Sequence, residues 1–339
     1  MQFDTLVYIG RFQPFHLGHA AMLELALAQA QQVVLVLGSA HSARTTRNPF
    51  SVDERQQMII DALPAEAAAR LRFVPMRDYY NGARWAAAVR RAVAALPGLG
   101  RVGLFGHFKD ASSGYLRDFP DWPLLAVENQ GGINAADLRA PWFASGGDTE
   151  ALAQALPASV RQFLANFAST AHFARLQAEY AFLQQYRQDW QAAPYPPVFV
   201  TVDAVVCCQG HVLLVQRGGQ PGVGCWALPG GFLDQRERVA DASLRELMEE
   251  TCLAVDRDTL MRGYQGQQLF DHPDRSARGR TLTHAFHYQL DCTSLPAIRA
   301  ADDAQAAKWL PISDLQALEA LMHDDHFIIL DHFLHLLAD

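Results

Sequence analysis

LVYIGRFQPFHLGHAAMLELALAQAQQVVLVL, residues 6–37, contains two short apolar runs separated by a turn-rich loop and an Ala- and Leu-rich segment. The runs at 6–9 and 33–37 predict β-strands, and the segment from about 18 to 31 predicts a helix. A strand, a helix and a second strand in this order form a βαβ unit with parallel strands. The stretch therefore predicts the start of an α/β domain.

The same alternation continues beyond this unit. Helices are predicted near 53–63 and 84–96, and strands near 71–75 and 101–105. This pattern predicts a doubly wound, Rossmann-like parallel sheet, whose ligands bind at the carboxyl ends of the strands. Residues 158–190 predict a helix without a chemical motif, and the PYPP sequence at 194–197 ends it.

The second half of the chain has a different character. β-rich segments at 198–208, 212–216 and 281–290 surround one predicted helix at 239–251, and the closing segment 312–337 also predicts helix. A length of 339 residues fits two domains. We predict an α/β domain at 1–168, a helical connection and linker at 169–194, and an α+β domain at 195–339.

Composition narrows the class of protein. Hydrophobic residues make up 50% and charged residues 19% of the chain, which supplies two cores and excludes disorder as the main state. The net charge of -8 argues against general binding to nucleic acid, and no apolar run is long enough to cross a membrane. The N-terminus has no secretory pattern, and the five cysteines show no Cys-x-x-Cys spacing. We expect a cytoplasmic protein with reduced thiols.

The first candidate site lies between the end of the first predicted strand and the start of the first predicted helix. His16 and His19 are three residues apart at the helix start, so their rings can lie on one side of it. Free backbone N–H groups and the positive end of the helix dipole attract phosphate there, and Gly18 lets a ligand approach the backbone. The alternative is that both are surface histidines at a helix cap.

The string GRFQPFHLGH, residues 10–19, resembles the signature of nucleotidylyltransferases, specifically nicotinamide mononucleotide (NMN) adenylyltransferases of the archaeal-like type. The resemblance extends over most of residues 4–140 and implies transfer of AMP from ATP to NMN, giving NAD and pyrophosphate. It implies that charge on the phosphates is neutralised by Mg²⁺ and by Arg11, His16, His19, Arg47 and Arg139. It implies substrate binding by Gly10, Phe12, Gly18, Gly38, Ser39, Asp78, Asn81, Trp85 and Asn134.

Two segments of the first domain carry this resemblance less clearly. The family's second signature carries hydroxyl residues where this chain has Asn134-Ala135-Ala136, which removes side-chain donors to phosphate but leaves a helix cap and Arg139. Lys109-Asp110 also resembles a family segment, but a solvated salt bridge is an equally good interpretation, so we do not count this pair as catalytic.

The second candidate site is an acidic helix. Helical spacing places Leu244, Leu247, Met248 and Thr251 on one face and Glu246, Glu249 and Glu250 on the opposite one. Like charges three and four residues apart repel unless a cation lies among them, and Mg²⁺ or Mn²⁺ suits carboxylate oxygens. The alternative is a solvated acidic face.

The segment from Leu228-Pro229-Gly230-Gly231 to Leu253 resembles the Nudix box. The resemblance implies an α/β/α sandwich, metal ligation by Glu246, Glu249 and Glu250, a catalytic role for Glu250, and a Glu237–Arg245 pair; Gly231 and Arg245 are assigned to substrate binding. Cys252 stands where the box usually has glycine, and a left-handed backbone there would be strained. Residues 271–283 resemble the ADP-ribose pyrophosphatase branch, although Ser276-Ala277 depart from its pattern.

The whole chain thus resembles the bifunctional NMN adenylyltransferase/Nudix hydrolase family, with ATP, NMN and ADP-ribose as its small-molecule partners. Alternatives are a transferase acting on another acceptor, or a Nudix domain that serves as a non-catalytic ligand sensor. We expect neither nucleic acid nor a membrane as partner, and a homo-oligomer stays open. Cys207-Cys208 are expected to pack in a core. Four histidines near the C-terminus are expected on a solvated helical face: His323, His326, His332 and His335.

Overall fold

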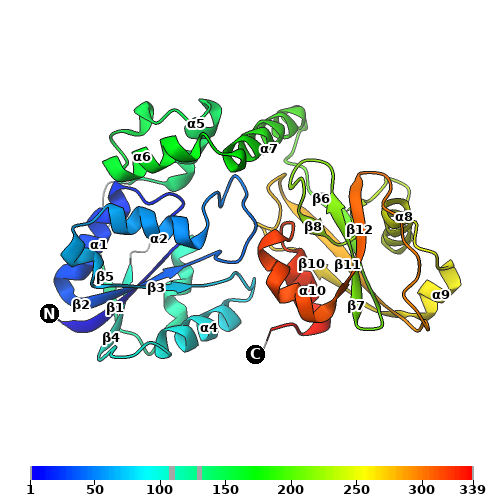
Figure 1. Cartoon of the computed structure of the whole chain (residues 1–339), viewed down its shortest axis with the longest axis horizontal. Coiled ribbons are helices and arrows are strands. Elements are labelled where there is room, and N and C mark those ends of the chain that lie inside the picture. The colour runs from blue at the N-terminus through cyan, green and yellow to red at the C-terminus, as the bar shows by residue number, and fades with distance from the viewer. Residues whose placement is uncertain (1, 107–110, 128–131, 338–339) are drawn as a thin grey trace. The chain divides into compact units, whose positions relative to one another are not determined.

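The computed structural model describes residues 2–106, 111–127 and 132–337, and the chain divides into two units, Met1–Tyr180 and Ala181–Asp339 (Figure 1). Lys109 and Asp110 lie outside the described residues. The first unit contains a five-stranded parallel sheet in the order β3-β2-β1-β4-β5. Its strands are β1 (Phe3–Gly10), β2 (Ala30–Leu37), β3 (Leu71–Pro75), β4 (Val102–Gly106) and β5 (Leu124–Ala126).

Helices cover both faces of this sheet, because alternate residues of the central strands are apolar on both sides. Leu6 and Leu35 pack with residues of α1 (Leu17–Gln29) and α2 (Val52–Asp61), while Val7 and Val34 pack with α4 (Gly82–Ala94). The strand order changes direction between β1 and β4, which in such sheets is where ligands bind. The predicted Rossmann-like architecture is confirmed. Further elements are α3 (Ala65–Ala68), η1 (Ala111–Asp118), α5 (Ala135–Ala144) and η2 (Glu150–Leu152).

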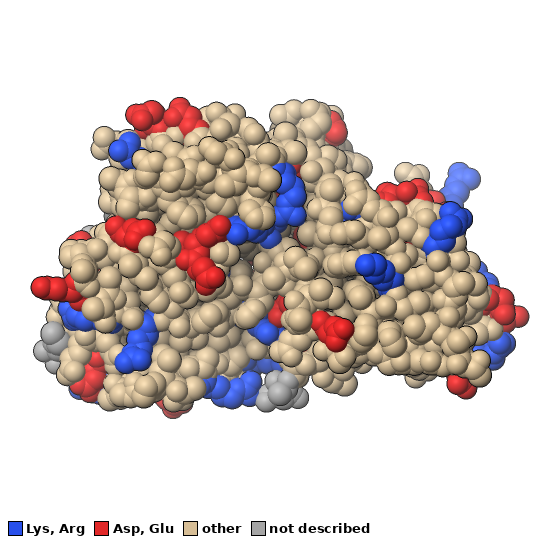
Figure 2. Space-filling view, in the orientation of Figure 1, with Lys and Arg blue, Asp and Glu red and all other residues tan. Residues whose placement is uncertain are grey.

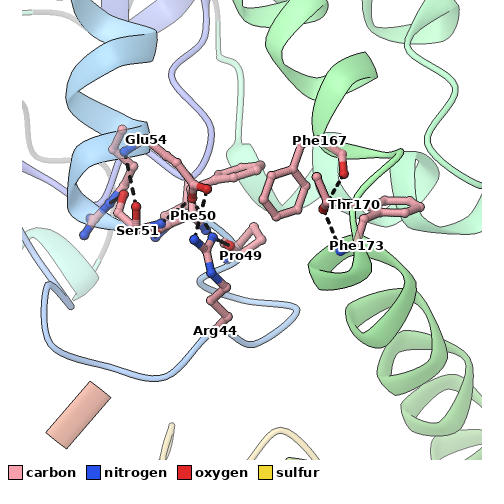
Figure 3. Close-up of polar contacts among 10 residues, drawn as sticks. Arg44, Pro49, Phe50, Ser51, Glu54, Phe167, Thr170 and Phe173 are labelled. Carbon is pink, nitrogen blue, oxygen red and sulfur yellow. Dashed lines mark hydrogen bonds and ion pairs between the residues drawn. The ribbon is translucent and has the colours of Figure 1, made fainter. Parts of the chain in front are cut away.

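The helical stretch predicted over 158–190 is two helices, α6 (Ala158–Phe167) and α7 (Ala171–Asp189). Thr170 separates them: its Oγ1 donates a hydrogen bond to the Phe167 carbonyl at 2.7 Å and accepts one from the Phe173 N–H at 3.2 Å (Figure 3). The hydroxyl thus ends one helix and caps the next. Helical periodicity on both sides conceals such a break in the sequence.

The second unit contains a mixed sheet in the order β10-β11-β6-β7-β12, with β8 paired to β7 and β9 to β6. β6 and β11 are parallel, and the other pairs are antiparallel. The strands are β6 (Phe199–Cys208), β7 (His211–Arg217), β8 (Trp226–Ala227), β9 (Gly230–Phe232), β10 (Tyr264–Phe270), β11 (Thr281–Leu290) and β12 (Ala304–Pro311).

Helices pack on both faces of this sheet. α8 (Val239–Thr251) shares a core with Val202, Ala204 and Val206, and α10 (His326–Leu334) shares one with Val205 and Cys207. This is the predicted α/β/α sandwich, and Cys207-Cys208 are buried as expected. The closing segment is less helical than predicted, since η3 (Ile312–Leu321) is a 3-10 helix and 322–325 separate it from α10. A short helix, α9 (Arg257–Arg262), precedes β10.

The surface visible in Figure 2 carries acidic and basic side chains interspersed among uncharged ones. Among the described residues, none of the helices combines the length and apolar character that a bilayer crossing requires.

Candidate active sites

The loop that follows β1 closes tightly over the end of that strand. Phe12 has a left-handed backbone with a φ of 52°, and its ring turns back over Gly10. A Cβ at Gly10 would lie 2.8 Å from that ring, so the close approach requires glycine. Phe12 is only 1% exposed and packs against Tyr8 and His19. The Phe12 side chain therefore lies beneath the loop, and substrate binding by this residue stays a prediction.

The two predicted histidines lie together at the start of α1. His16 is the N-cap residue, and its Nδ1 accepts a hydrogen bond from the His19 backbone N–H at 3.3 Å. The two rings stack with their centroids 3.5 Å apart, and Gly18 between them is buried. The first turn of a helix leaves backbone N–H groups unsatisfied and carries the positive end of the dipole. Imidazoles beside such a helix end suit a phosphate group.

Three predicted arginines gather at this loop. The Arg139 guanidinium donates to the Gln13 carbonyl at 2.6 Å and to the Thr46 carbonyl at 3.1 Å. Burial lowers the pKa of Arg139 to about 10, and the positive charges of Arg11 and Arg47 act in the same direction. Cations held close together in this way favour a ligand with several negative charges.

Arg55 also belongs to this site, although our sequence analysis assigned it no role. Its side chain is 1% exposed, and its Nη1 donates to the carbonyls of Arg11 at 2.8 Å and Gly38 at 2.7 Å. Its Nε donates to the Ser51 carbonyl at 3.2 Å. Burial, the main cause, lowers the pKa of Arg55 to about 10. One guanidinium therefore ties together three loops that border the site, which no local spacing in the sequence indicates.

The loop that carries Arg47 is anchored at both of its ends. Arg44 donates from Nη2 to Glu54 Oε1 at 2.9 Å and from Nη1 to the Pro49 carbonyl at 2.7 Å (Figure 3). Glu54 also forms, with Ser51, the capping box at the start of α2. A partly buried ion pair that is bidentate and joined to a helix cap holds its loop better than an exposed pair does.

Further residues predicted to bind substrate follow β2 and β3, and Asp78, Asn81 and Trp85 among them are predicted to hold the nicotinamide. Ser39, whose φ is 50°, donates from Oγ to Asp78 Oδ2 at 2.6 Å, so the fold brings these two predicted residues together. Asn81 caps α4 by accepting from the Arg84 N–H at 2.9 Å. Trp85 is half-buried and lies edge-on to Phe119 with ring centroids 5.8 Å apart.

The second signature of the first unit begins α5. Asn134 is its N-cap and accepts from the Ala136 N–H at 3.2 Å, so the predicted helix cap is present without the family's hydroxyl residues. The nearby charge of Asp137 raises the pKa of Arg139 and so opposes the effect of burial.

In the second unit, the glycines of β9 bring the backbone against the carboxylates of α8. The Gly230 N–H donates to Glu250 Oε2 at 3.0 Å. A Cβ on Gly231 would lie 2.5 Å from Glu246 Oε1, and one on Gly230 would lie 2.2 Å from the Val202 carbonyl oxygen. Both positions therefore need glycine so that the loop can lie between the strand and the acidic helix.

Arg245 connects the loop to the acidic helix. Its Nη2 donates to Glu237 Oε2 at 2.9 Å, and its Nε lies 3.0 Å from Glu237 Oε1, so this predicted pair forms. Its Nη1 donates to Glu246 Oε1 and to Glu249 Oε2, both at 2.9 Å. Hydrogen bonding to Arg245 lowers the pKa of Glu237. One guanidinium thus holds three carboxylates in place.

The expected division of α8 into an apolar and an acidic face is wrong at two positions. Glu250 is 4% exposed and lies on the buried side, while Met248 is 38% exposed. The Gly230 N–H satisfies the buried carboxyl, which is why a charged residue type is tolerated there. Cys252, which ends α8, has the expected left-handed backbone with a φ of 43° and a ψ of 39°.

Asp303 is a second residue that our sequence analysis missed. It immediately precedes β12, and its carboxyl group acts on that of Glu250, whose pKa it raises. Burial first, and then Asp303, raise the pKa of Glu250 to about 9; burial also raises the pKa of Glu246. A lone Asp beside a strand has no distinguishing spacing, so only the fold brings it here.

These carboxyl groups fit a divalent cation by their chemistry. Burial and neighbouring carboxyl groups raise the pKa values of Glu246 and Glu250, and a positive ion would stabilise both as anions. Across residues 2–106, 111–127 and 132–337, no set of three His, Cys, Asp or Glu side chains forms a ready-made metal site. Arg245 instead lies between Glu246 and Glu249.

The expectation of a solvated histidine face near the C-terminus is wrong for two of its four members. His323 and His326 are 6% and 7% exposed, whereas His332 and His335 are exposed. Burial lowers the pKa of His326 to about 3 and that of His323 well below its usual value, so both are neutral. Both precede or begin α10, which turns them into the unit rather than along its surface.

Comparison with known proteins finds relatives of both units. Residues 198–333 match the family model of the NUDIX domain, and residues 7–79 match that of Cytidylyltransferase-like proteins. A nicotinamide/nicotinic acid mononucleotide adenylyltransferase of Acinetobacter baylyi is 39% identical over 181 residues, which are 53% of this chain and 94% of that protein. An ADP-ribose pyrophosphatase of Methanocaldococcus jannaschii is 35% identical over 133 residues, 39% of this chain and 72% of that protein.

One solved protein matches over both units. The crystal structure of a bifunctional NMN adenylyltransferase/ADP ribose pyrophosphatase from Francisella tularensis has a TM-score of 0.92 and 36% identity, and the match covers 98% of this chain and 99% of that one. The same protein complexed with AMP and a Mn ion matches with a TM-score of 0.91 and 35% identity, over 98% of this chain and 99% of that one. This chain therefore belongs to the family of bifunctional NMN adenylyltransferase/ADP-ribose pyrophosphatases.

Proposed function

We propose that the first unit transfers AMP from ATP to nicotinamide mononucleotide, giving NAD and pyrophosphate. We propose further that the second unit hydrolyses ADP-ribose to AMP and ribose 5-phosphate. The observation that carries this proposal is that two sites of opposite charge lie on one chain: an arginine and histidine cluster at the start of α1, and a carboxyl cluster on α8. A Francisella protein that is similar over both units has both activities in its name.

The transfer step needs charge neutralisation more than proton transfer. The 5′-phosphate of the mononucleotide is already an anion, so it can attack the α-phosphorus of ATP without a general base, and pyrophosphate leaves. Arg11, Arg47 and Arg139 would bind the triphosphate, and His16 and His19 would donate to oxygens that gain charge in the transition state. Gly10, Gly18 and Gly38 would let the nucleotide approach the backbone.

The nicotinamide part of NMN, the proposed acceptor, would lie beside α4. Ser39 and Asp78 form a polar pair there, Asn81 begins the helix, and Trp85 offers an aromatic ring to the nicotinamide. Asn134 would place the amides at the start of α5 near phosphate.

For hydrolysis, Glu246, Glu249 and Glu250 would hold Mg²⁺ or Mn²⁺, and the Francisella structure with a Mn ion supports this choice. A divalent cation bound there would supply a nucleophilic water and neutralise the diphosphate. Gly231 and Arg245 would contact the substrate or the loop that holds it. Glu250 would act as a catalytic residue as well as a metal ligand. Asp303, whose carboxyl group raises the pKa of Glu250, belongs to the same cluster.

The experiment that tests both halves is product analysis by chromatography, with Mg²⁺ in every tube. We expect NAD and pyrophosphate from NMN with ATP, and AMP with ribose 5-phosphate from ADP-ribose. Pantetheine phosphate and flavin mononucleotide, each offered with ATP, test for another acceptor. Tight binding of ADP-ribose without turnover would show that the second unit is a sensor.

Other features of the protein stay at the level of proposals. We propose domain limits of 1–168 and 195–339 with a linker between them, a cytoplasmic location, and no nucleic acid or membrane among its partners. A homo-oligomer is compatible with these assignments, and size-exclusion chromatography with light scattering would measure it.

A further inference from the structure

The loop that carries the two glycines of the hydrolytic site is held from inside the second unit by a histidine. The backbone N–H of Leu228 donates to His326 Nδ1 at 2.8 Å, across 98 residues of sequence. Leu228 and His326 are 1% and 7% exposed, so no water competes for this bond. A buried N–H that lost its acceptor would cost the loop more stability than an ordinary surface hydrogen bond contributes.

The chemistry of the ring is determined by its surroundings. His326 is neutral because burial lowers its pKa, and Nδ1 acts as the acceptor, so the proton lies on Nε2. That nitrogen faces Asp203, with 3.8 Å between His326 Nε2 and Asp203 Oδ1. Asp203 in turn accepts from Thr283 Oγ1 at 2.6 Å. The acceptor role of Nδ1 follows from the Leu228 N–H, which can only donate, and Asp203 lies near the nitrogen that carries the proton.

Asp203 also contacts the loop directly. It pairs with Gly230 in the register of β6 and β9, and a Cβ on Gly230 would lie 2.7 Å from Asp203 Oδ1. The Pro229 carbonyl accepts from the Ala204 N–H at 2.9 Å. The histidine and the aspartate thus hold the loop on both sides of Pro229.

The segment that precedes α10 is itself firmly fixed, which gives His326 a defined place. Arg275 donates to Asp325 through two hydrogen bonds of 2.8 and 3.0 Å, and these side chains are 5% and 0% exposed. The backbone N–H of His323 donates to the Trp226 carbonyl at 2.8 Å. A buried bidentate pair of this kind is strongly orienting, because breaking it would leave an unpaired charge inside the protein.

These contacts lead directly to the carboxyl cluster. Two residues after Leu228, the Gly230 N–H donates to Glu250, and Glu246 fills the space beside Gly231. We propose that His326 is a positioning residue of the hydrolytic site: by accepting the Leu228 amide hydrogen, it fixes the backbone of residues 228–231 on which Glu246 and Glu250 rest. This proposal rests on the proposed hydrolytic function of the second unit. His326 is not a catalytic residue, since the loop backbone separates it from the carboxyl groups.

The test uses two variants of similar size in the full-length protein. In His326→Asn the amide oxygen can take the place of Nδ1, whereas in His326→Gln the amide lies nearer the place of Nε2. We expect His326→Gln to lower kcat for ADP-ribose hydrolysis by roughly 10-fold to 100-fold, with KM changed less than about 3-fold. We expect His326→Asn to stay within about 5-fold of the wild-type kcat.

Two further measurements distinguish a positioning role of His326 from a general loss of stability in the variants. Mn²⁺ binding without substrate, measured by electron paramagnetic resonance, should weaken in His326→Gln by roughly 10-fold and much less in His326→Asn. His332→Gln, an exposed position on the same helix, is the matched control and should change neither property. Two outcomes would overturn the proposal. In the first, both variants lose kcat equally and in proportion to the fall in their melting temperatures. In the second, His326→Gln keeps the wild-type kcat and the wild-type affinity for Mn²⁺.

A measurement on the wild-type protein keeps the proposal testable if the variants do not fold. Nitrogen-15 NMR should show His326 as the neutral Nε2–H tautomer, and the Leu228 amide should exchange with solvent only slowly. The opposite tautomer, or rapid exchange at Leu228, would contradict it. Absence of ADP-ribose hydrolysis by the wild type would instead reject the proposed function, while Mn²⁺ binding and the NMR measurement would still decide the role of His326.

Discussion

Arg55 and Arg139 in the first unit donate to backbone carbonyls of the loops around them, whereas Glu246 and Glu250 in the second unit share hydrogen bonds with Arg245 and Gly230. The first site is therefore positive and held by main-chain acceptors, which do not change their charge. The second site is rich in carboxyl groups whose pKa values are raised, so part of its negative charge depends on a cation.

The two sites therefore bind phosphate groups in different ways. A preorganised cationic cluster can bind a triphosphate directly, because its donors are already oriented. A carboxyl cluster repels phosphate until a divalent cation reverses the local charge. The two units should thus respond differently to loss of one side chain, to metal and to pH.

The largest expected effect is on the carboxyl cluster. Glu250→Gln should lower the rate of ADP-ribose hydrolysis by roughly 10³-fold or more, because it removes a negative ligand for the cation. NAD synthesis by the same preparation should be unchanged. Asp258→Asn, an exposed position on α9, serves as the control. Hydrolysis near the wild-type rate would mean that the acidic side of α8 is only solvated surface.

A smaller loss is expected on the cationic side. His19→Ala should lower kcat for NAD synthesis by roughly 10²-fold, because the transition state loses a preorganised donor while the arginines remain. His172→Ala, an exposed histidine on α7, is the matched control. Parallel loss of both activities in a folded His19→Ala protein would contradict two separate sites.

Arg55 tests whether main-chain anchoring prepares the cationic site. Lysine cannot present a planar set of donors to the carbonyls of Arg11, Gly38 and Ser51, so Arg55→Lys should raise KM for ATP by roughly 10-fold. ADP-ribose hydrolysis should not change, and Arg91→Lys on the exposed side of α4 should leave both activities intact. An unchanged KM for ATP would show that these loops hold their arrangement without Arg55.

The pH dependence of stability should reveal the carboxyl cluster in the metal-free protein. The pKa of Glu250 is about 9 in the folded state against 4.5 when unperturbed, so the folded state holds its proton more tightly. Stability gained from that proton is complete below about pH 4.5 and is lost as the pH rises toward 9. Wild-type Tm should therefore fall between pH 5 and 9 by on the order of 10 °C more than that of Glu250→Gln. Parallel curves for the two proteins would show that Glu250 is ionised without metal.

Sequence patterns predict the elements of this protein better than its long-range contacts. Periodicity predicts β11 and α8 with their observed bounds, and the strand-to-helix turn at Gly10 locates the cationic site. The break at Thr170 escapes prediction because helical spacing continues on both sides of it. A local hydroxyl cap cannot be told from an ordinary helical threonine by periodicity alone.

The residues that were missed or misplaced share one cause. His326 was expected in solvent, yet its partner Leu228 is 98 residues away. Arg55 reaches carbonyls at positions 11 and 38, and Asp303 reaches Glu250 from another strand. Burial of a polar side chain depends on partners that only the folded chain supplies, so these roles have no local signal.

The smallest expected effect concerns the end of α8. Cys252 has a left-handed backbone, and its Sγ lies 3.2 Å from Arg299 Nη2. Cys252→Gly relieves the strain but loses that contact and adds unfolded-chain entropy, so we expect a gain of about 0.5 kcal/mol, or one to two degrees in Tm. Cys252→Ala, which loses the contact but keeps the strain, should be less stable than both. A lower Tm for the glycine variant than for the wild type would show that the thiol contact outweighs the strain.

The central claim is that one chain carries a cationic transfer site and a separate, metal-dependent hydrolytic site. Phosphorus-31 NMR of a single tube with NMN, ATP, ADP-ribose and Mg²⁺ tests it most directly, for the wild type, His19→Ala and Glu250→Gln. We predict that the wild type forms pyrophosphate with NAD and also AMP with ribose 5-phosphate. His19→Ala should lose only the first pair of products and Glu250→Gln only the second. If either folded variant lost both pairs of products, or if both variants kept both pairs, the two-site assignment would be wrong.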